Sequence, residues 1–143
     1  MDYQLKRINP FWHTHPIIPT LVAVGGILGF IGYARQTPSI AYVGGVIAAA
    51  AILGAARPAL SLLFATMGLL GGLTQFAIAP TLNASTFTAF EKVLAVSFYT
   101  VCYAVLLDAV VLVGAALYNF YAGVIGFGGL RMEFENAGEE TTP

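Results

Sequence analysis

The sequence predicts an all-α integral membrane protein with four transmembrane helices, and three observations lead to that class. The 143 residues are 58% hydrophobic and only 9% charged, whereas about a quarter of the residues of a soluble domain are charged. Only five formal charges occur between Ile8 and Leu130, too few to cover a soluble domain of this length. The apolar residues fall in runs about as long as a bilayer is thick. Four of the charges lie at the boundaries of such runs (Arg35, Arg57, Glu91 and Lys92), and Asp108 lies within one.

The first two spans are predicted at residues 17–34 and 39–56, each ended by an arginine. Both lengths are at the short end of the 17–25 residues that cross the hydrocarbon core. The connections at 35–38 and 57–58 are too short for anything but tight antiparallel hairpins. Pro58 suits the first turn of the next helix, where its missing N–H is no loss.

The third and fourth spans are predicted at residues 59–79 and 93–121. Pro80 ends the third, and a polar stretch from Thr81 to Thr88 leads to the fourth, with Asn83 or Ser85 as its expected N-cap. The fourth helix is the longest, longer than the bilayer is thick. It either projects beyond the membrane or stops near Gly123, with residues 123–130 lying along the interface.

Three segments follow from these spans. Residues 1–16 form an N-terminal interfacial segment, residues 17–121 the transmembrane domain, and residues 122–143 an interfacial segment with an acidic polar tail. From Arg131 onward the tail has nothing to pack, and we expect a solvated extension.

The charges favour one orientation and exclude one class of partner. With four spans both termini lie on the same side, and that side would carry four basic residues against two on the other. This excess favours the cytoplasmic or matrix side for both termini. A net charge of −1 leaves no basic surface for nucleic acid. The first side would hold Lys6, Arg7, Arg57 and Arg131, and the second Arg35 and Lys92.

Small residues recur at a spacing of four along the first three spans. Such stripes let helix backbones approach closely, which in lipid replaces the hydrophobic drive that holds helices together in water. Two interpretations remain open: packing within this chain, or an association surface for partner subunits or further copies. The helix-packing candidates are Gly25, Gly29, Gly44, Gly45, Gly68 and Gly72.

Asp108 is the candidate functional residue. Its neighbours three and four positions away are apolar, and a carboxylate in hydrocarbon costs several kcal/mol unless it is protonated or paired. A partner must come from another span or from another protein. We favour a structural hydrogen bond or a salt bridge to a neighbouring subunit; a place on a proton or substrate path, or an interfacial position, are the alternatives. The polar groups available within the chain are Ser61, Thr66, Thr74 and Gln75.

Other candidates carry less chemistry. His13 and His15 could contribute to a metal site, but a site needs a third ligand, and we favour polar residues at the headgroup level. Tyr99 and Tyr103 are four residues apart and share a helix face, which indicates packing against another helix. Cys102 is the single cysteine, so the chain cannot form an internal disulfide. We predict no catalytic residue, no metal and no cofactor.

Residues 24–30 (VGGILGF), followed by PSIA at 38–41 and a second span rich in glycine and alanine, resemble the opening of the transmembrane protein 14 family. The resemblance covers residues 21–75. It implies a small multi-span protein of a mitochondrial-type membrane that assists transport, some members being linked to porphyrin or fatty-acid movement. The later proline-glycine span of that family has no counterpart here.

Together these features predict a non-catalytic integral membrane subunit of a larger assembly, in particular a respiratory or other energy-converting complex. Its partners would be other membrane subunits and lipids. The mitochondrial inner membrane is the expected location. The alternative is a small homo-oligomeric carrier or channel with Asp108 on its path, although transporters usually show several intramembrane polar groups or broken helices.

Overall fold

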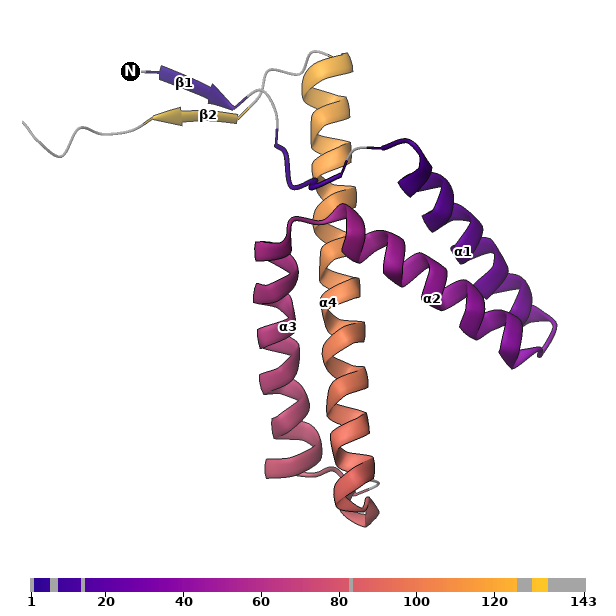
Figure 1. The fold of residues 1–143 in the computed structure, drawn as a ribbon. Helices are drawn as coiled ribbons and strands as arrows, with labels where there is room; N and C mark the ends of the chain where they lie inside the picture. The colour runs from indigo at the N-terminus through magenta and orange to yellow at the C-terminus, as the bar shows by residue number, and fades with distance from the viewer. Residues whose placement is uncertain (1, 6–7, 14, 83, 126–129, 134–143) are drawn as a thin grey trace, which may run out of the picture. The chain divides into compact units, whose positions relative to one another are not determined.

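The computed structural model describes residues 2–5, 8–13, 15–82, 84–125 and 130–133. The described part holds four long helices: α1 (Ile17–Ala34), α2 (Pro38–Ala55), α3 (Pro58–Leu73) and α4 (Ala89–Phe120) (Figure 1). Each is long and apolar enough to cross a membrane, α3 and α4 together with the turns that extend them. The chain is therefore a helical, multi-pass membrane protein by length and composition.

The helices α1 and α2 lie side by side and run antiparallel (Figure 1). A Cβ atom added at Gly25 would lie 2.6 Å from the Ala48 nitrogen, and one added at Gly32 would collide with the backbone of Ala41. A Cβ atom added at Gly44 would likewise collide with the backbone of Gly29. Only glycine lets the two backbones approach this far, which is how small residues hold helices together in lipid.

The turn between α1 and α2 occupies residues 35–37. Gln36 has a positive φ of 54°, and its N–H donates to the carbonyl of Tyr33 over 3.1 Å. The N–H of Thr37 donates to the carbonyl of Gly32 over 2.8 Å. These bonds satisfy carbonyl groups that the end of a helix leaves free.

The helices α3 and α4 form a second antiparallel pair. A Cβ atom at Gly68 would lie 2.9 Å from the Tyr103 Cβ, and one at Gly72 would lie 3.4 Å from Val96. Beyond Leu73 the helix widens into the π-helix η1 (Thr74–Ile78), ended by a 2.8 Å bond from the Ala79 N–H to the Thr74 carbonyl. The third span therefore reaches Ile78, close to the predicted end at residue 79.

The connection to α4 contains the short 3₁₀ helix η2 (Ala84–Thr86). The fourth helix begins at Ala89, earlier than the predicted apolar start at residue 93. Thr88 and Glu91 form a capping box: the Thr88 N–H donates to Glu91 Oε2 over 2.7 Å, and the Glu91 N–H donates to Thr88 Oγ1 over 3.4 Å. The predicted cap at Ser85 is wrong, because Ser85 lies within η2; Asn83 lies outside the described residues.

The length of α4 exceeds the membrane core. Its 32 residues span roughly 48 Å at about 1.5 Å per residue, against about 30 Å of hydrocarbon. A tilt of 0–40°, the usual range, does not absorb that difference. The π-helix η3 (Tyr121–Ile125) then continues the chain beyond Phe120, so part of this element lies outside the hydrocarbon.

The structure divides into two compact units, Pro10–Leu112 and a second unit made of Met1–Asn9 with Val113–Pro143. In the second unit, β1 (Asp2–Leu5) pairs antiparallel with β2 (Leu130–Glu133). This differs from the unpacked tail expected from Arg131 onward. The register joins Asp2 to Glu133 and Leu5 to Leu130. Residues 126–129 and 134–143 of the predicted interfacial segment and tail lie outside the described residues.

Candidate functional site: a buried carboxyl group between two helices

Asp108 lies between α3 and α4, with 0% of its surface exposed. The Oγ of Ser61 donates a 2.6 Å hydrogen bond to Asp108 Oδ2. The second oxygen, Oδ1, is buried and has no hydrogen-bond partner in the part of the chain that the structure describes. The site is therefore one carboxyl group held by one hydroxyl, with one oxygen unsatisfied.

The register of the two helices explains why Ser61 is the partner. In an antiparallel pair, moving toward the start of α3 means moving toward the end of α4. Gly68 contacts Thr100 and Tyr103, and Gly72 contacts Val96. Two turns before Gly68, the same register brings Ser61 opposite Asp108.

The other polar candidates for pairing with Asp108 are engaged elsewhere or lie on the surface. The hydroxyl of Thr66 donates to the Leu62 carbonyl and that of Thr74 to the Leu70 carbonyl, each over 2.8 Å. These bonds to the preceding turn are common for hydroxyl side chains in helices. Gln75 is exposed. The structure thus selects Ser61 from the four possibilities.

The depth of the site follows from the position of Ser61 in α3. Ser61 is three residues after Pro58, the first residue of the helix, so it lies only about 4.5 Å along the helix axis from that end. Asp108, which is bonded to Ser61, therefore lies about one helical turn along the axis from the start of α3, yet its carboxyl group is buried. A neighbouring subunit cannot contact Oδ1 without displacing the residues that cover it.

The six glycines predicted for helix packing separate into two groups. Gly25, Gly44, Gly68 and Gly72 are buried against a neighbouring helix of this chain, and Gly29 makes ordinary contacts of 3.9 Å with α2. Gly45 differs, because a Cβ atom there would meet nothing within 4 Å. The same is true of four glycines that were not among the six: Gly26, Gly54, Gly114 and Gly123.

An aromatic cluster fills the other end of the α3–α4 pair. Tyr99 and Tyr103 stack with ring centroids 6.0 Å apart, and Phe76 meets Tyr99 edge-on and stacks on Phe87. The Tyr99 ring lies 3.3 Å from a Cβ atom placed on Gly71. The pair predicted to pack against another helix does so against the glycines of α3.

Two polar contacts in the structure were not among those predicted from the sequence. Asn119, near the end of α4, binds the backbone of Ile8 twice: its Oδ1 accepts the Ile8 N–H over 2.9 Å, and its Nδ2 donates to the Ile8 carbonyl over 2.7 Å. No sequence pattern indicates a bond between residues so far apart. The Thr88–Glu91 capping box, in contrast, is readable as a threonine followed three residues later by glutamate.

The two histidines take separate roles. His13 Nδ1 donates to the carbonyl of Gly54 over 3.2 Å, and His15 Nδ1 accepts the N–H of Ile17 over 3.3 Å. Within the described ranges, no group of three or more His, Cys, Asp or Glu side chains is placed to hold a metal ion. Cys102 is exposed on α4.

No protein-family model, curated protein or solved structure matches this chain. The resemblance of residues 21–75 to the transmembrane protein 14 family therefore stays a prediction.

Proposed function

We propose that this chain is a non-catalytic integral membrane subunit that acts in the assembly or stabilisation of a larger membrane complex. The observation that supports this proposal is that other parts of the chain cover little of the apolar surface of its spans. In the most apolar stretch of each span, 11% of the residues are buried in the first three and 17% in the fourth. Large apolar side chains such as Phe30, Tyr42 and Phe98 are more than 70% exposed.

The open glycines support association with other membrane helices. Gly26, Gly45 and Gly114 face away from every described neighbour, so a partner helix can approach the backbone closely there. Lipid alone needs no such residues, and glycine costs about 1 kcal/mol relative to alanine inside a helix. Other membrane subunits, together with lipids, are the partners that this surface suits.

The kind of assembly is part of the same proposal. We place the chain in a respiratory or other energy-converting complex of the mitochondrial inner membrane, with both termini on the matrix side. The resemblance to the transmembrane protein 14 family and the excess of basic residues on that side favour this placement. The pairing of Asp2–Leu5 with Leu130–Glu133 supports a common side for the two termini.

A second candidate function is a homo-oligomeric carrier or channel with Asp108 on its path. The favouring observation is the buried Oδ1 atom that no described residue satisfies, because intramembrane carboxyl groups often mark proton or ion pathways. Against it, Ser61 is the only polar side chain bonded to Asp108 among the described residues. A path across the bilayer normally needs several such groups.

Native electrophoresis after mild detergent extraction tests the first proposal. We expect the chain to migrate with an assembly many times its own 15.0 kDa mass, and a small discrete oligomer would contradict the subunit proposal. Gly26→Leu, Gly45→Leu and Gly114→Leu then probe the outward faces. At least one should release the chain from the assembly with its helix content unchanged by circular dichroism; release by none would refute association through these glycines.

Asp108→Asn in reconstituted vesicles tests the second. The amide keeps the shape of the side chain and still accepts the Ser61 hydrogen bond, but it cannot exchange a proton. Loss of proton flux with an intact oligomer would favour the carrier. Unchanged flux, or none in either protein, would exclude it.

A further inference from the structure

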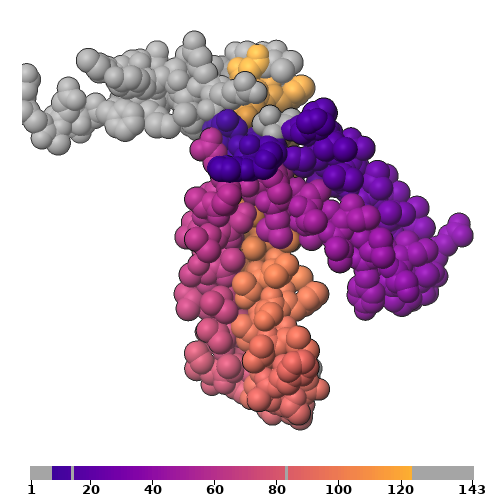
Figure 2. Space-filling model, viewed as in Figure 1, coloured from indigo at the N-terminus to yellow at the C-terminus, as the bar shows by residue number. Residues whose placement is uncertain are grey.

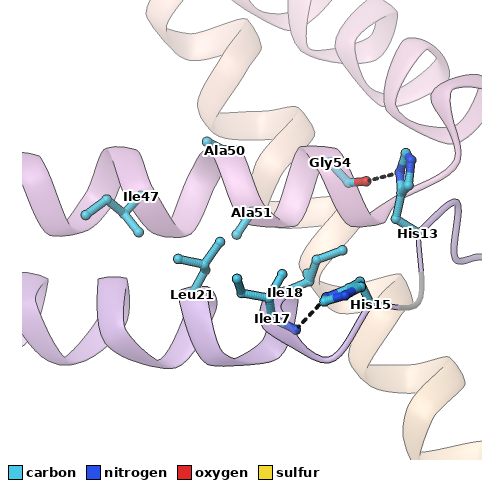
Figure 3. Close-up of a pocket in the computed structure, with 9 residues that line it drawn as sticks. All are labelled: His13, His15, Ile17, Ile18, Leu21, Ile47, Ala50, Ala51 and Gly54. Atoms are coloured by element: carbon cyan, nitrogen blue, oxygen red, sulfur yellow. Dashed lines mark hydrogen bonds between the residues drawn. The ribbon is translucent and has the colours of Figure 1, made fainter.

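A cavity of about 570 Å³ opens between the start of α1 and the end of α2. Figure 3 shows the residues that line it, which come from the two helices and from the segment that precedes α1. The size lies within the 300–1,000 Å³ typical of ligand sites. The lining consists of His13, His15, Ile17, Ile18, Leu21, Ile47, Ala50, Ala51 and Gly54.

The hollow arises from the order of small and large residues on the facing helices. On α2, Ala50 and Ala51 lie three and four residues after Ile47, and Gly54 lies four and three residues after them, so the four residues share one side of the helix. Three of the four are alanine or glycine, which leave space above the backbone. Isoleucine and leucine side chains of α1 form the opposite wall (Figure 3).

One end of this groove is lined by two histidine side chains, and their hydrogen bonds determine which ring nitrogen of each carries a proton. A carbonyl oxygen can only accept, so His13 carries its proton on Nδ1. His15 accepts the Ile17 N–H at Nδ1, so in the neutral ring its proton is on Nε2. His15 therefore presents an N–H donor, and neutral His13 an acceptor.

The backbone at the start of α1 supplies no competing donor. The N–H of Ile17 bonds to His15 Nδ1, and the N–H of Ile18 bonds to the His15 carbonyl over 3.1 Å. Pro19 has no N–H. The polar end of the groove is therefore made by side chains, not by the free amides of a helix start.

The groove runs from the headgroup level into the hydrocarbon. Trp12, next to His13, is 61% exposed, and exposed tryptophan is typical of the membrane interface. From Gly54 back to Ile47 the floor follows α2 for about 10 Å toward the bilayer centre. An occupant must therefore be polar at one end and apolar along the rest.

An apolar transmembrane helix is about 10 Å across and its backbone polar groups are bonded within the helix, so it does not complement a groove with a hydrogen-bond donor at one end. A single flexible acyl chain is narrower and supplies only apolar surface. We propose that the groove binds one phospholipid, with an acyl chain between α1 and α2 and a phosphate oxygen accepting the His15 Nε2–H.

Photo-crosslinking tests this site in the full-length protein, reconstituted into dioleoylphosphatidylcholine vesicles. The probe is a phosphatidylcholine with a diazirine in the middle of one acyl chain. Mass spectrometry should find Leu21 and Ile47 labelled several-fold more than residues outside the groove that are at least as exposed, such as Val24 and Val46. Even labelling of all outward faces would overturn the proposal.

Two matched variants separate filling of the groove from a general disturbance. Ala50→Phe places a ring in the hollow and should reduce groove labelling several-fold. Val46→Phe adds a ring on the same helix at a residue that is 68% exposed and does not line the cavity, so it should leave the labelling unchanged. Equal effects of the two variants would contradict a specific site.

His15→Asp tests the phosphate contact. Aspartate still accepts the Ile17 N–H near the helix start, but it offers no donor and repels phosphate. Phosphatidylcholine should label the groove more than a diacylglycerol with the same chain, and this preference should vanish in the variant. A preference that survives would refute the role of His15; a partner protein that crosslinks in the groove and excludes lipid would refute the occupant. None of these results depends on native migration, so they are independent of the subunit proposal.

Discussion

Ser61 and Asp108 join α3 to α4 through a 2.6 Å hydrogen bond between two side chains 47 positions apart in the sequence. The bond lies one turn from the start of α3, and the four small and apolar helix neighbours of Asp108 offer it no alternative. This contact fixes the register of the pair at one end, while Gly68, Gly72 and the aromatic cluster fix it along the rest. Figures 1 and 2 show α3 and α4 lying side by side.

Removing the Ser61 hydroxyl should destabilise the α3–α4 pair. Ser61→Ala leaves both oxygens of a buried carboxyl group without a donor, which costs about 1–3 kcal/mol, more than the roughly 0.6 kcal/mol average for hydrogen bonds in membrane proteins. Reversible unfolding in mixed micelles measures the loss. Ser97→Ala is the control, because the exposed Ser97 hydroxyl only bonds to the carbonyl of Val93 and its removal should have little effect. Equal losses would mean that Asp108 does not depend on Ser61.

The neighbours Gly44 and Gly45 should respond to alanine with opposite signs. A methyl group at Gly44 would collide with the backbone of Gly29, whereas one at Gly45 meets open space. Alanine gains about 1 kcal/mol of helix propensity at either position, but the crowding at Gly44 costs about 1–3 kcal/mol. Thermal unfolding of the two variants in the same detergent should place Gly44→Ala below the parent protein and Gly45→Ala at or above it.

Breaking the capping box should loosen the first turn of α4. Thr88→Ala removes the hydroxyl that accepts the Glu91 N–H, at a typical cost of about 1 kcal/mol. Hydrogen exchange should become faster at residues 89–92 and stay unchanged in the middle of the helix. Ser85→Ala, three residues earlier in η2, is the comparison variant, because the exposed Ser85 hydroxyl donates to the Leu82 carbonyl, and exchange at residues 89–92 should match the parent protein.

Asn119 should hold Ile8 through both of its amide atoms. Asn119→Asp keeps an acceptor for the Ile8 N–H but loses the donor to the Ile8 carbonyl, and Asn119→Leu loses both. Protection of the Ile8 amide against hydrogen exchange should therefore fall in the leucine variant and persist in the aspartate variant. Loss of protection in both would show that the donor, not the acceptor, holds this segment.

The sequence indicates the spans well because charged side chains are costly in hydrocarbon. Arg35 and Arg57 end the first two runs, and the observed helices at 17–34 and 38–55 lie within one residue of the predicted ones. The fourth helix begins at Ala89, later than a cap at Ser85 predicts, because Thr88 and not Ser85 is followed three residues later by the glutamate that completes the cap. Hydropathy locates the part of a helix in lipid, not the part that extends into the interface.

The pairing of Asp108 was predictable only as a short list of candidates. The hydroxyls of Thr66 and Thr74 can satisfy themselves within their own helix, which favours Ser61 only in retrospect. The choice depends on the register of α3 against α4, and that register is set by contacts such as Gly68 with Tyr103. The pairing of residues 2–5 with 130–133 has no local signal at all, since most of the chain separates the two strands.

The same strand pairing sets an order of events during synthesis. Residues 2–5 leave the ribosome long before residues 130–133 and have no strand to pair with until those residues are made. At about 5–20 residues per second this wait lasts roughly 6–25 s, and it ends only after the fourth helix has been synthesised. The β1–β2 contact is therefore a late event that follows translation of the four spans, so an antibody or a protease that distinguishes unpaired β1 from paired β1 would report when the last span of a single molecule has been made.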